Sequence, residues 1–226
     1  MKRVCLLNGS LRGEKASSLE FLNRVSARMS AADFHIDRVT VKSGVNGRYP
    51  DETLAAVANS DAVVMAFPLF CYTLPGALTR FLEDFYFYAK EGERYNKRAK
   101  VFAIINCGFP EPWIIEEAIR VVRNFCARLG LSYRFAIAIA AGPVTLMTMK
   151  IPFLNPRLKK AFTGLAKDAG GDETVRREDI FIKPIIPKGI LIKIKEHYEK
   201  KSPTLYAPTV HRTGPLSPKE CEPARR

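Results

Sequence analysis

Apolar runs and amphipathic stretches alternate along the first 170 residues, and this alternation is the strongest constraint on the fold. Most of the apolar runs are continuous, which is typical of strands covered on both faces. Stretches with apolar residues at helical spacing follow them. The segments that we expect to be strands are residues 4–7, 34–41, 62–67, 101–105 and 133–140. Strands that alternate with helices predict an α/β fold, a doubly wound parallel sheet with helices on both faces.

The number and length of these strands predict a five-stranded sheet in the order 2-1-3-4-5. In such a sheet a ligand binds at the carboxyl ends of strands one and three. Response-regulator receivers share this topology, but they need acidic residues at the strand ends. The first strand here ends in Asn8 and the third in Phe67-Pro68. The sequence therefore argues against a receiver domain.

The 226 residues divide into three predicted parts. Residues 1–170 form the α/β domain, in which 142–156 read as an irregular apolar loop and 157–169 as the last helix over the sheet. Residues 171–201 form a C-terminal extension with apolar segments broken by proline. Residues 202–226 are rich in proline, serine and charge, so we expect a mobile basic tail that can be removed without loss of the fold.

The composition is that of an ordinary soluble protein with a basic balance. Hydrophobic residues make up 47% and charged residues 26%, and the net charge is +13. A basic protein is attracted to phosphates, but these charges are scattered, so we do not expect nucleic-acid binding. No signal peptide is expected after Lys2-Arg3, and Gly142-Pro143 interrupts the longest apolar run, so we expect a cytoplasmic protein without a membrane span.

The cysteines are widely spaced and form no Cys-x-x-Cys pair, so no metal site is expected. Three of them lie within apolar patterns and read as reduced core residues. Cys71 lies in a loop without a histidine nearby in the sequence, which argues against a catalytic thiol. We assign no catalytic residue. The five cysteines are Cys5, Cys71, Cys107, Cys126 and Cys221.

The loop between the first strand and the first helix carries groups that suit a phosphate. A helix start presents free backbone N–H groups and the positive end of the helix dipole. Ser10, Ser17 and Ser18 add hydroxyl donors, and Arg12 adds a guanidinium. The alternative is an ordinary strand-to-helix turn capped by serine.

This loop matches neither Gly-x-x-x-x-Gly-Lys-Ser/Thr nor Gly-x-Gly-x-x-Gly. Gly9-Ser10-x-Arg12 followed by Ser17-Ser18 instead resembles the first loop of the NAD(P)H-dependent FMN reductases, a branch of the flavodoxin-like flavoproteins. In that family the loop holds the FMN phosphate. The resemblance implies the same role for Gly9, Ser10, Arg12, Ser17 and Ser18.

The segment after the third strand carries a second resemblance to this family. A strand ends at a proline, an aromatic residue and a short loop follow, and Leu74-Pro75-Gly76 opens a helix. The resemblance implies that the isoalloxazine ring is lined by Pro68, Leu69, Phe70, Cys71 and Tyr72. The family often has tyrosine in place of Phe70, a small residue near Tyr72, lysine in place of Thr79 and arginine in place of Phe85. Phe70 and Tyr72 could instead pack in the core.

The loop after the fourth strand is the third to agree with the family. In the family it covers the pyrimidine edge and the dimethylbenzene side of the flavin. The resemblance therefore implies contacts from Asn106, Gly108 and Phe109, and a glycine lets the backbone approach a flat ring. The alternative is a plain turn in which Pro110 helps to start the next helix.

Taken together, the resemblance covers about residues 2–170 and implies an FMN-dependent NAD(P)H oxidoreductase. Hydride would come from NADH or NADPH and pass to a free flavin, a quinone or another small acceptor. One alternative is a non-enzymatic electron carrier or an FMN-binding interaction module, although carrier flavodoxins usually present an acidic face. Another is a fold that binds no flavin and uses its basic tail on nucleic acid.

Residues 85–88, Phe-Tyr-Phe-Tyr, place four aromatic side chains at one end of a predicted helix. A single core face does not easily bury so many, and flavodoxin-like reductases often complete the flavin pocket with residues of a neighbour. The sequence therefore favours a homodimer, with burial of these residues in the core as the alternative.

Overall fold

The computed structural model describes residues 1–44, 49–151, 153–172, 178–186 and 189–190. The chain separates into two compact units, Met1–Ile185 and Ile186–Arg226. Nearly all of the second unit lies outside the described residues, and so does the predicted tail at 202–226. The sheet and the helices that cover it belong to the first unit.

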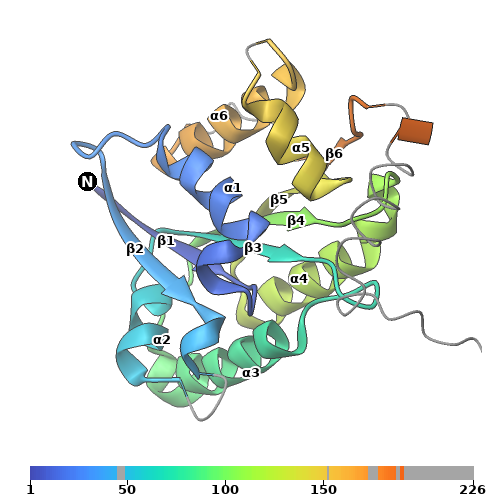
Figure 1. Cartoon of the computed structure of the whole chain (residues 1–226). Coiled ribbons are helices and arrows are strands. Elements are labelled where there is room, and N and C mark those ends of the chain that lie inside the picture. Colours follow the sequence, from blue (N-terminus) through green and yellow to red (C-terminus); the bar gives the residue numbers. More distant parts are fainter. Residues whose placement is uncertain (45–48, 152, 173–177, 187–188, 191–226) are drawn as a thin grey trace, which may run out of the picture. The chain divides into compact units, whose positions relative to one another are not determined.

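The centre of the first unit is a parallel sheet with the strand order β2-β1-β3-β4-β5-β6 (Figure 1). The order of the first five strands confirms the prediction. The strands are β1 (Lys2–Asn8), β2 (Phe34–Thr40), β3 (Ala62–Pro68), β4 (Lys100–Asn106), β5 (Ser132–Ile139) and β6 (Ile180–Ile182).

The sixth strand corrects the predicted count of five. β6 has only three residues and is soon followed by Pro184, so its sequence carries little strand signal. Asp179, which precedes it, holds this segment against β5. Its Oδ1 accepts hydrogen bonds from the Tyr133 hydroxyl at 2.6 Å and from the Ala136 N–H at 2.8 Å. The strand therefore depends on tertiary contacts rather than on local propensity.

Helices cover both faces of the sheet. α2, α3 and α4 lie on one face, and α1, α5 and α6 lie on the other (Figure 1). The helices are α1 (Ser17–Ser26), α2 (Asp51–Ala58), α3 (Gly76–Lys90), α4 (Glu116–Leu129), α5 (Gly142–Met149) and α6 (Pro156–Gly170), with short 3₁₀ turns η1 (Gly13–Lys15), η2 (Val41–Gly44), η3 (Glu91–Glu93) and η4 (Pro112–Ile115). Each of these helices is too short or too polar to cross a bilayer.

Two apolar cores follow from this layering. In β1, Cys5 and Leu7 belong to the core under α2–α4, whereas Val4 and Leu6 belong to the core under α1, α5 and α6. All four side chains are buried, and a buried side chain of this size stabilises the fold by about 1.5–3 kcal/mol. The continuous apolar runs in the sequence therefore reflect strands that are covered on both sides.

The expected loop at 142–156 is wrong for its first half, because Gly142–Met149 forms α5. The glycine and proline at its start argued against a helix. Pro143 lies in the first turn, where a missing N–H breaks no helical hydrogen bond. Ala141, just before the helix, adopts a left-handed conformation with φ of 45°.

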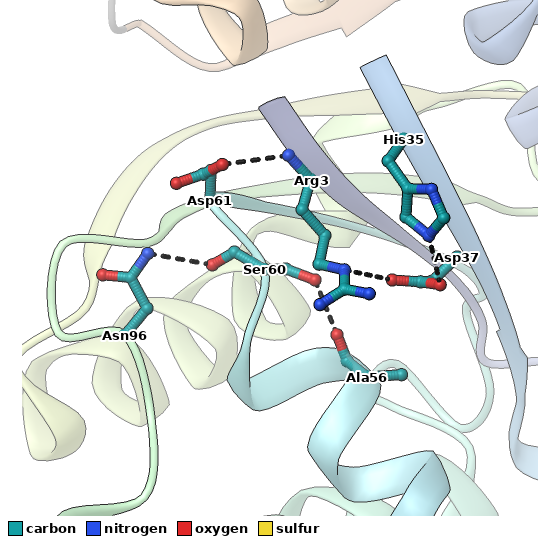
Figure 2. A network of polar contacts seen from close by, with 7 residues as sticks. All are labelled: Arg3, His35, Asp37, Ala56, Ser60, Asp61 and Asn96. Carbon is teal, nitrogen blue, oxygen red and sulfur yellow. Dashed lines mark hydrogen bonds and ion pairs between the residues drawn. The ribbon is translucent and has the colours of Figure 1, made fainter. Parts of the chain in front are cut away.

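A network of polar contacts ties together the amino ends of the strands (Figure 2). The Arg3 N–H donates to Asp61 Oδ2 at 2.9 Å, which links β1 to the turn before β3. The Arg3 side chain pairs with Asp37 of β2 at 3.1 Å, and His35 Nε2 lies 3.2 Å from the same carboxylate. Asn96, before β4, donates to the Ser60 carbonyl at 3.1 Å.

Most of the aromatic cluster at the end of α3 packs into the domain itself. Phe85 is buried, and Tyr86 and Tyr88 pack partly against the core. Phe87 is 70% exposed. The cluster therefore gives little support to the predicted dimer, which stays a prediction.

Candidate functional site

Three loops converge at the carboxyl edge of the sheet, and they are the loops after β1, β3 and β4. Two backbone hydrogen bonds connect them. The Gly9 N–H donates to the carbonyl of Ala66 at 2.8 Å, and the Leu69 N–H donates to the carbonyl of Asn106 at 2.7 Å. The structure thus brings together the three segments that the sequence singled out.

The loop after β1 is held in shape by the side chain of Asn8. Its Oδ1 accepts the Ser10 N–H at 3.2 Å, and its Nδ2 donates to the Gly13 carbonyl at 3.3 Å. Gly13 has a φ of 55°, a conformation that favours glycine. Contacts within the domain therefore fix the shape of this loop.

Gly9 is required by packing inside the domain. A Cβ at this position would lie 2.9 Å from both Leu78 Cδ2 and Phe67 Cβ, which is closer than real contacts allow. Packing alone therefore accounts for a glycine at this position. The missing side chain also lets the loop lie tightly against β3.

The polar side chains of this loop fall into two groups. Ser10 and Ser18 are buried, with their hydroxyl oxygens accepting hydrogen bonds from the Arg12 N–H at 3.3 Å and from Asn106 Nδ2 at 3.1 Å. Arg12 is exposed, and Ser17 is half-buried at the first residue of α1. The groups nearest to solvent that suit an anion are therefore Arg12, Ser17 and the free N–H groups of the first helical turn, while the buried Ser10 and Ser18 hydroxyls each keep an O–H to donate.

Asn106 lies inside the domain rather than on its surface. It is 5% exposed, and its Nδ2 also donates to the Phe67 carbonyl at 3.2 Å. A Cβ at Gly142 would lie 2.9 Å from its Oδ1, so α5 begins directly against it. Asn106 thus joins the ends of β3 and β4 to the starts of α1 and α5.

The loop after β3 is a two-residue turn in a rare conformation. The N–H groups of Phe70 and Thr73 each donate to the other residue's carbonyl at 2.9 Å. Cys71 and Tyr72 between them have φ values of 46° and 62°, and neither is glycine. A left-handed conformation costs roughly 1–2 kcal/mol for such residues, and stored strain of this kind is found at binding sites. The two central N–H groups take no part in the turn's own hydrogen bonds.

The side chains of this turn point to solvent. Phe70 is 63% exposed and Tyr72 is 61% exposed, which excludes the alternative that they pack in the core. Pro68 and Leu69, before the turn, are half-buried. Cys71 is exposed as well.

The loop after β4 adds a second aromatic residue beside Tyr72. The rings of Tyr72 and Phe109 are nearly parallel, with an interplanar angle of 17° and centroids 6.2 Å apart. Phe109 is half-exposed, and its carbonyl accepts the Ala141 N–H at 2.8 Å, which fastens the loop to the end of β5. A Cβ at Gly108 would have no neighbour within 4 Å, so its backbone is open to approach.

Three further residues at this edge were not predicted from the sequence. Trp113 is 52% exposed, and Lys183 Nζ lies 5.7 Å from its ring centroid. Lys42, after β2, packs against the first loop, since a Cβ at Gly13 would lie 3.0 Å from its Cδ. The position of Lys42 just after β2 could have placed it at this edge, because all parallel strands deliver their following residues to the same edge of the sheet.

The chemistry of these groups is that of binding rather than of acid or base catalysis. His35 lies at the opposite edge of the sheet, and His197 and His211 fall outside the described residues. Burial raises the pKa of the Cys107 thiol. Within the described ranges, no three His, Cys, Asp or Glu side chains are grouped so as to hold a metal ion.

No protein-family model matches the chain, and no curated protein matches it either. Solved structures do match in fold. An NADH:FMN oxidoreductase in its apo form superposes with a TM-score of 0.58 at 12% identity, covering 79% of this chain and 95% of that one. An NADPH-quinone reductase from P. pentosaceus gives a TM-score of 0.52 at 13% identity, covering 74% and 98%.

An azoreductase from Bacillus anthracis str. Sterne gives a TM-score of 0.50 at 13% identity, covering 75% of this chain and 99% of that one. At such low identity these likenesses establish the fold alone. They confirm the flavodoxin-like fold that the resemblance of the loops implied.

Proposed function

We propose that this protein is an FMN-dependent NAD(P)H oxidoreductase that passes electrons to a small acceptor such as a flavin or a quinone. The observation that carries the proposal is the convergence of three loops at one sheet edge, where the start of α1 and an exposed aromatic turn both lie. Solved structures of the same fold include an NADH:FMN oxidoreductase and an NADPH-quinone reductase, which supports the same class of activity.

The β1–α1 loop fits the phosphate of FMN. A phosphate only accepts hydrogen bonds, and Arg12, Ser17 and the N–H groups at the start of α1 are donors. Ser10 and Ser18 belong to the proposed site as buried supports of the loop, since their hydroxyl oxygens accept hydrogen bonds within the domain and each O–H remains a donor. Gly9 lets the loop lie against β3.

The other two loops fit the ring of FMN. The N–H groups of Cys71 and Tyr72, which the turn's own hydrogen bonds do not use, suit the carbonyl oxygens and ring nitrogens of the isoalloxazine. The half-buried Pro68 and Leu69 suit its apolar part. Phe70 and Phe109 add aromatic surface. The open backbone of Gly108 permits close approach of the ring. Asn106 joins the ends of β3 and β4 beneath this site.

When bound, FMN supplies the acceptance and donation of hydride. The residues of this chain hold the phosphate, cover part of the ring and leave the remainder accessible to NAD(P)H and the acceptor. No side chain of the described site is required to transfer a proton, so we assign no catalytic residue. We further propose that the protein is a cytoplasmic homodimer that binds neither nucleic acid nor a membrane.

The test is to purify the protein, add FMN and measure binding from the shift of the flavin absorbance and the quenching of its fluorescence. We expect saturable binding, followed by bleaching of the flavin absorbance when NADH or NADPH is added without oxygen. Multi-turnover reduction of a quinone would then establish the enzyme. Light scattering at micromolar concentration with FMN bound tests the dimer.

Two other outcomes separate the alternatives. A protein that binds FMN but is reduced only by dithionite, and not by NADH or NADPH, would be an electron carrier or a flavin-binding module. A protein that binds neither FMN nor riboflavin would have the fold without the cofactor, and the proposal would fail.

A further inference from the structure

A cavity lies beside the loop after β1, between α1 and the β1–β2 edge of the sheet. It has a volume of about 480 Å³, which falls within the usual range for small-molecule pockets, about 300–1,000 Å³. The loops after β3 and β4, which carry the ring contacts of the proposed flavin site, do not line it. Gly13 and Glu14 of the β1–α1 loop do line it, so the cavity adjoins the proposed phosphate loop and extends from there toward the β2 edge.

The sheet register explains the floor of this cavity. Leu6 of β1 pairs with Arg38 of β2, and Asn8 pairs with Thr40. Residues two apart in a strand share a face, so these four side chains form one patch beneath α1. The half-buried Leu19 of α1 lines the same cavity, and Leu22 lies buried behind it. The cavity therefore combines apolar surface with polar groups.

Two cations line the cavity without a carboxylate partner. Arg38 donates to Asn23 Oδ1 at 2.9 Å and to Ser26 Oγ at 3.2 Å, and both acceptors are neutral. Lys42 has no carboxylate within ion-pair distance in the part of the chain that the structure describes. Arg38 is thus held in place with its charge uncompensated, which suits an anion.

The third charged group of the cavity is Glu14 of η1. An ionised carboxylate only accepts hydrogen bonds, so it repels a phosphate but suits the hydroxyl groups of a sugar. A ligand that matches all of these groups has an anionic end, a hydroxylated middle and an apolar flat end.

We propose that this cavity binds a nucleoside monophosphate. Arg38 and Lys42 contact the phosphate, Glu14 accepts hydrogen bonds from the ribose hydroxyls, and the base lies against the half-buried Leu19. The hydrogen bond from Asn8 Nδ2 to the Gly13 carbonyl fixes the part of the β1–α1 loop that lines this cavity. The proposal does not depend on flavin binding.

The test is isothermal titration of the full chain with AMP, with adenosine and inorganic phosphate as partial ligands. We expect saturable AMP binding with a Kd below about 1 mM. Loss of a hydrogen bond to a charged group weakens binding by roughly tenfold or more, so Arg38→Met and Lys42→Met should each have that effect on AMP. Adenosine binding should be nearly unchanged in Lys42→Met.

Three matched variants make the result specific. Lys90→Met, on α3 at the other face of the sheet, removes one positive charge and should leave AMP binding unchanged. Leu19→Trp fills the cavity without changing a charge and should abolish AMP binding. Arg12→Ala, in the proposed phosphate loop for FMN, should have little effect on AMP. Circular dichroism confirms that each variant is folded.

The proposal is overturned if wild-type protein binds no AMP at millimolar concentration. It is also overturned if Lys42→Met and Leu19→Trp both bind AMP as the wild type does. Loss of AMP binding in Arg12→Ala, with normal binding in Lys42→Met, would place the nucleotide at the flavin site instead.

Discussion

The two edges of the sheet are built on opposite principles. At the amino edge, charged side chains are paired and fasten neighbouring elements, as in the contacts of Arg3 with Asp37 and Asp61 (Figure 2). At the carboxyl edge, aromatic side chains are exposed and a two-residue turn adopts a left-handed conformation. One edge uses its polar groups to hold the fold, whereas the other leaves donors and flat surface for a ligand.

Buried charge shows the same contrast. Asp168 near the end of α6 is fully buried, and its two carboxylate oxygens pair with Lys100 Nζ at 2.9 Å and Arg134 Nη2 at 2.7 Å. These residues lie at the amino ends of β4 and β5. At the carboxyl edge, by contrast, the charged side chain of Arg12 is exposed. Charge therefore stabilises one edge and remains available at the other.

The largest effect that we expect is a difference in reactivity between the cysteines of the buried core and the cysteine of the exposed turn. Burial raises the pKa of Cys5 and of Cys126 to about 12, so at pH 8 almost none of either thiol is ionised. Cys71 in the strained turn is exposed. Iodoacetamide should label Cys71 at least about a thousandfold faster than Cys5 or Cys126 in the native protein.

Peptide mass spectrometry over time measures these rates, and labelling in urea supplies the control in which all sites react. Comparable native rates at Cys71 and Cys126 would show that the turn is protected in solution, and the contrast between exposed turn and closed core would fail.

Removal of the buried carboxylate tests the amino edge. Asp168→Asn leaves the Arg134 and Lys100 charges without their counter-ion, and Arg134 is only 2% exposed. Such a change costs about 3–5 kcal/mol. Urea denaturation should show this loss in the free energy of unfolding. A loss below about 1 kcal/mol would mean that water reaches these charges.

Removal of the exposed guanidinium tests the carboxyl edge. Arg12→Ala should weaken FMN binding by about 1.5–3 kcal/mol, or roughly ten- to a hundredfold, because a charge-assisted hydrogen bond is lost. Riboflavin has no phosphate, so its affinity should barely change. Ser17→Ala should cost less, since the N–H groups of the helix start remain. Flavin fluorescence titrations of both ligands into both variants measure the difference.

Equal losses for FMN and riboflavin would show that Arg12 supports the loop rather than the phosphate. The free energy of unfolding of Arg12→Ala serves as the control, and we expect it to match that of the wild type because the side chain is exposed.

In the strained turn, a substitution by glycine should stabilise the protein, whereas the other substitutions above weaken stability or binding. Cys71→Gly removes the cost of a left-handed side-chain residue at φ of 46° and should raise the free energy of unfolding by about 1 kcal/mol. Gly108→Ala in the next loop is a matched comparison, because its Cβ meets no neighbour within 4 Å and relieves no strain. Destabilisation by Cys71→Gly would mean that the turn conformation is not strained.

The smallest effect is expected at the exposed part of the amino-edge network. Asp37→Asn weakens the ion pair with Arg3, whose side chain is 46% exposed. Solvent screens such a pair, so the loss of stability should stay below about 1 kcal/mol and shrink further in salt. A loss as large as that of Asp168→Asn would show that the network, rather than burial, sets the strength of this edge.

The sequence by itself determined the α/β class, the five longest strands and their order. These follow from signals that are local and repeated, such as the apolar runs at 62–67 and 101–105. It also located the three loops of the candidate site, because parallel strands deliver their following residues to one edge. Their ligand contacts stay predictions.

Only the tertiary structure decided which way the side chains in these loops face. Ser18 and Asn106 read as ligand contacts, yet they are buried and bonded to each other across 88 positions in the sequence. Phe70 and Tyr72 could have packed in the core, yet they are exposed. The short strand β6 and the helix α5 likewise depend on partners distant in the chain. Local patterns report propensity and periodicity, whereas burial and pairing are set by neighbours that are close in space but not in sequence.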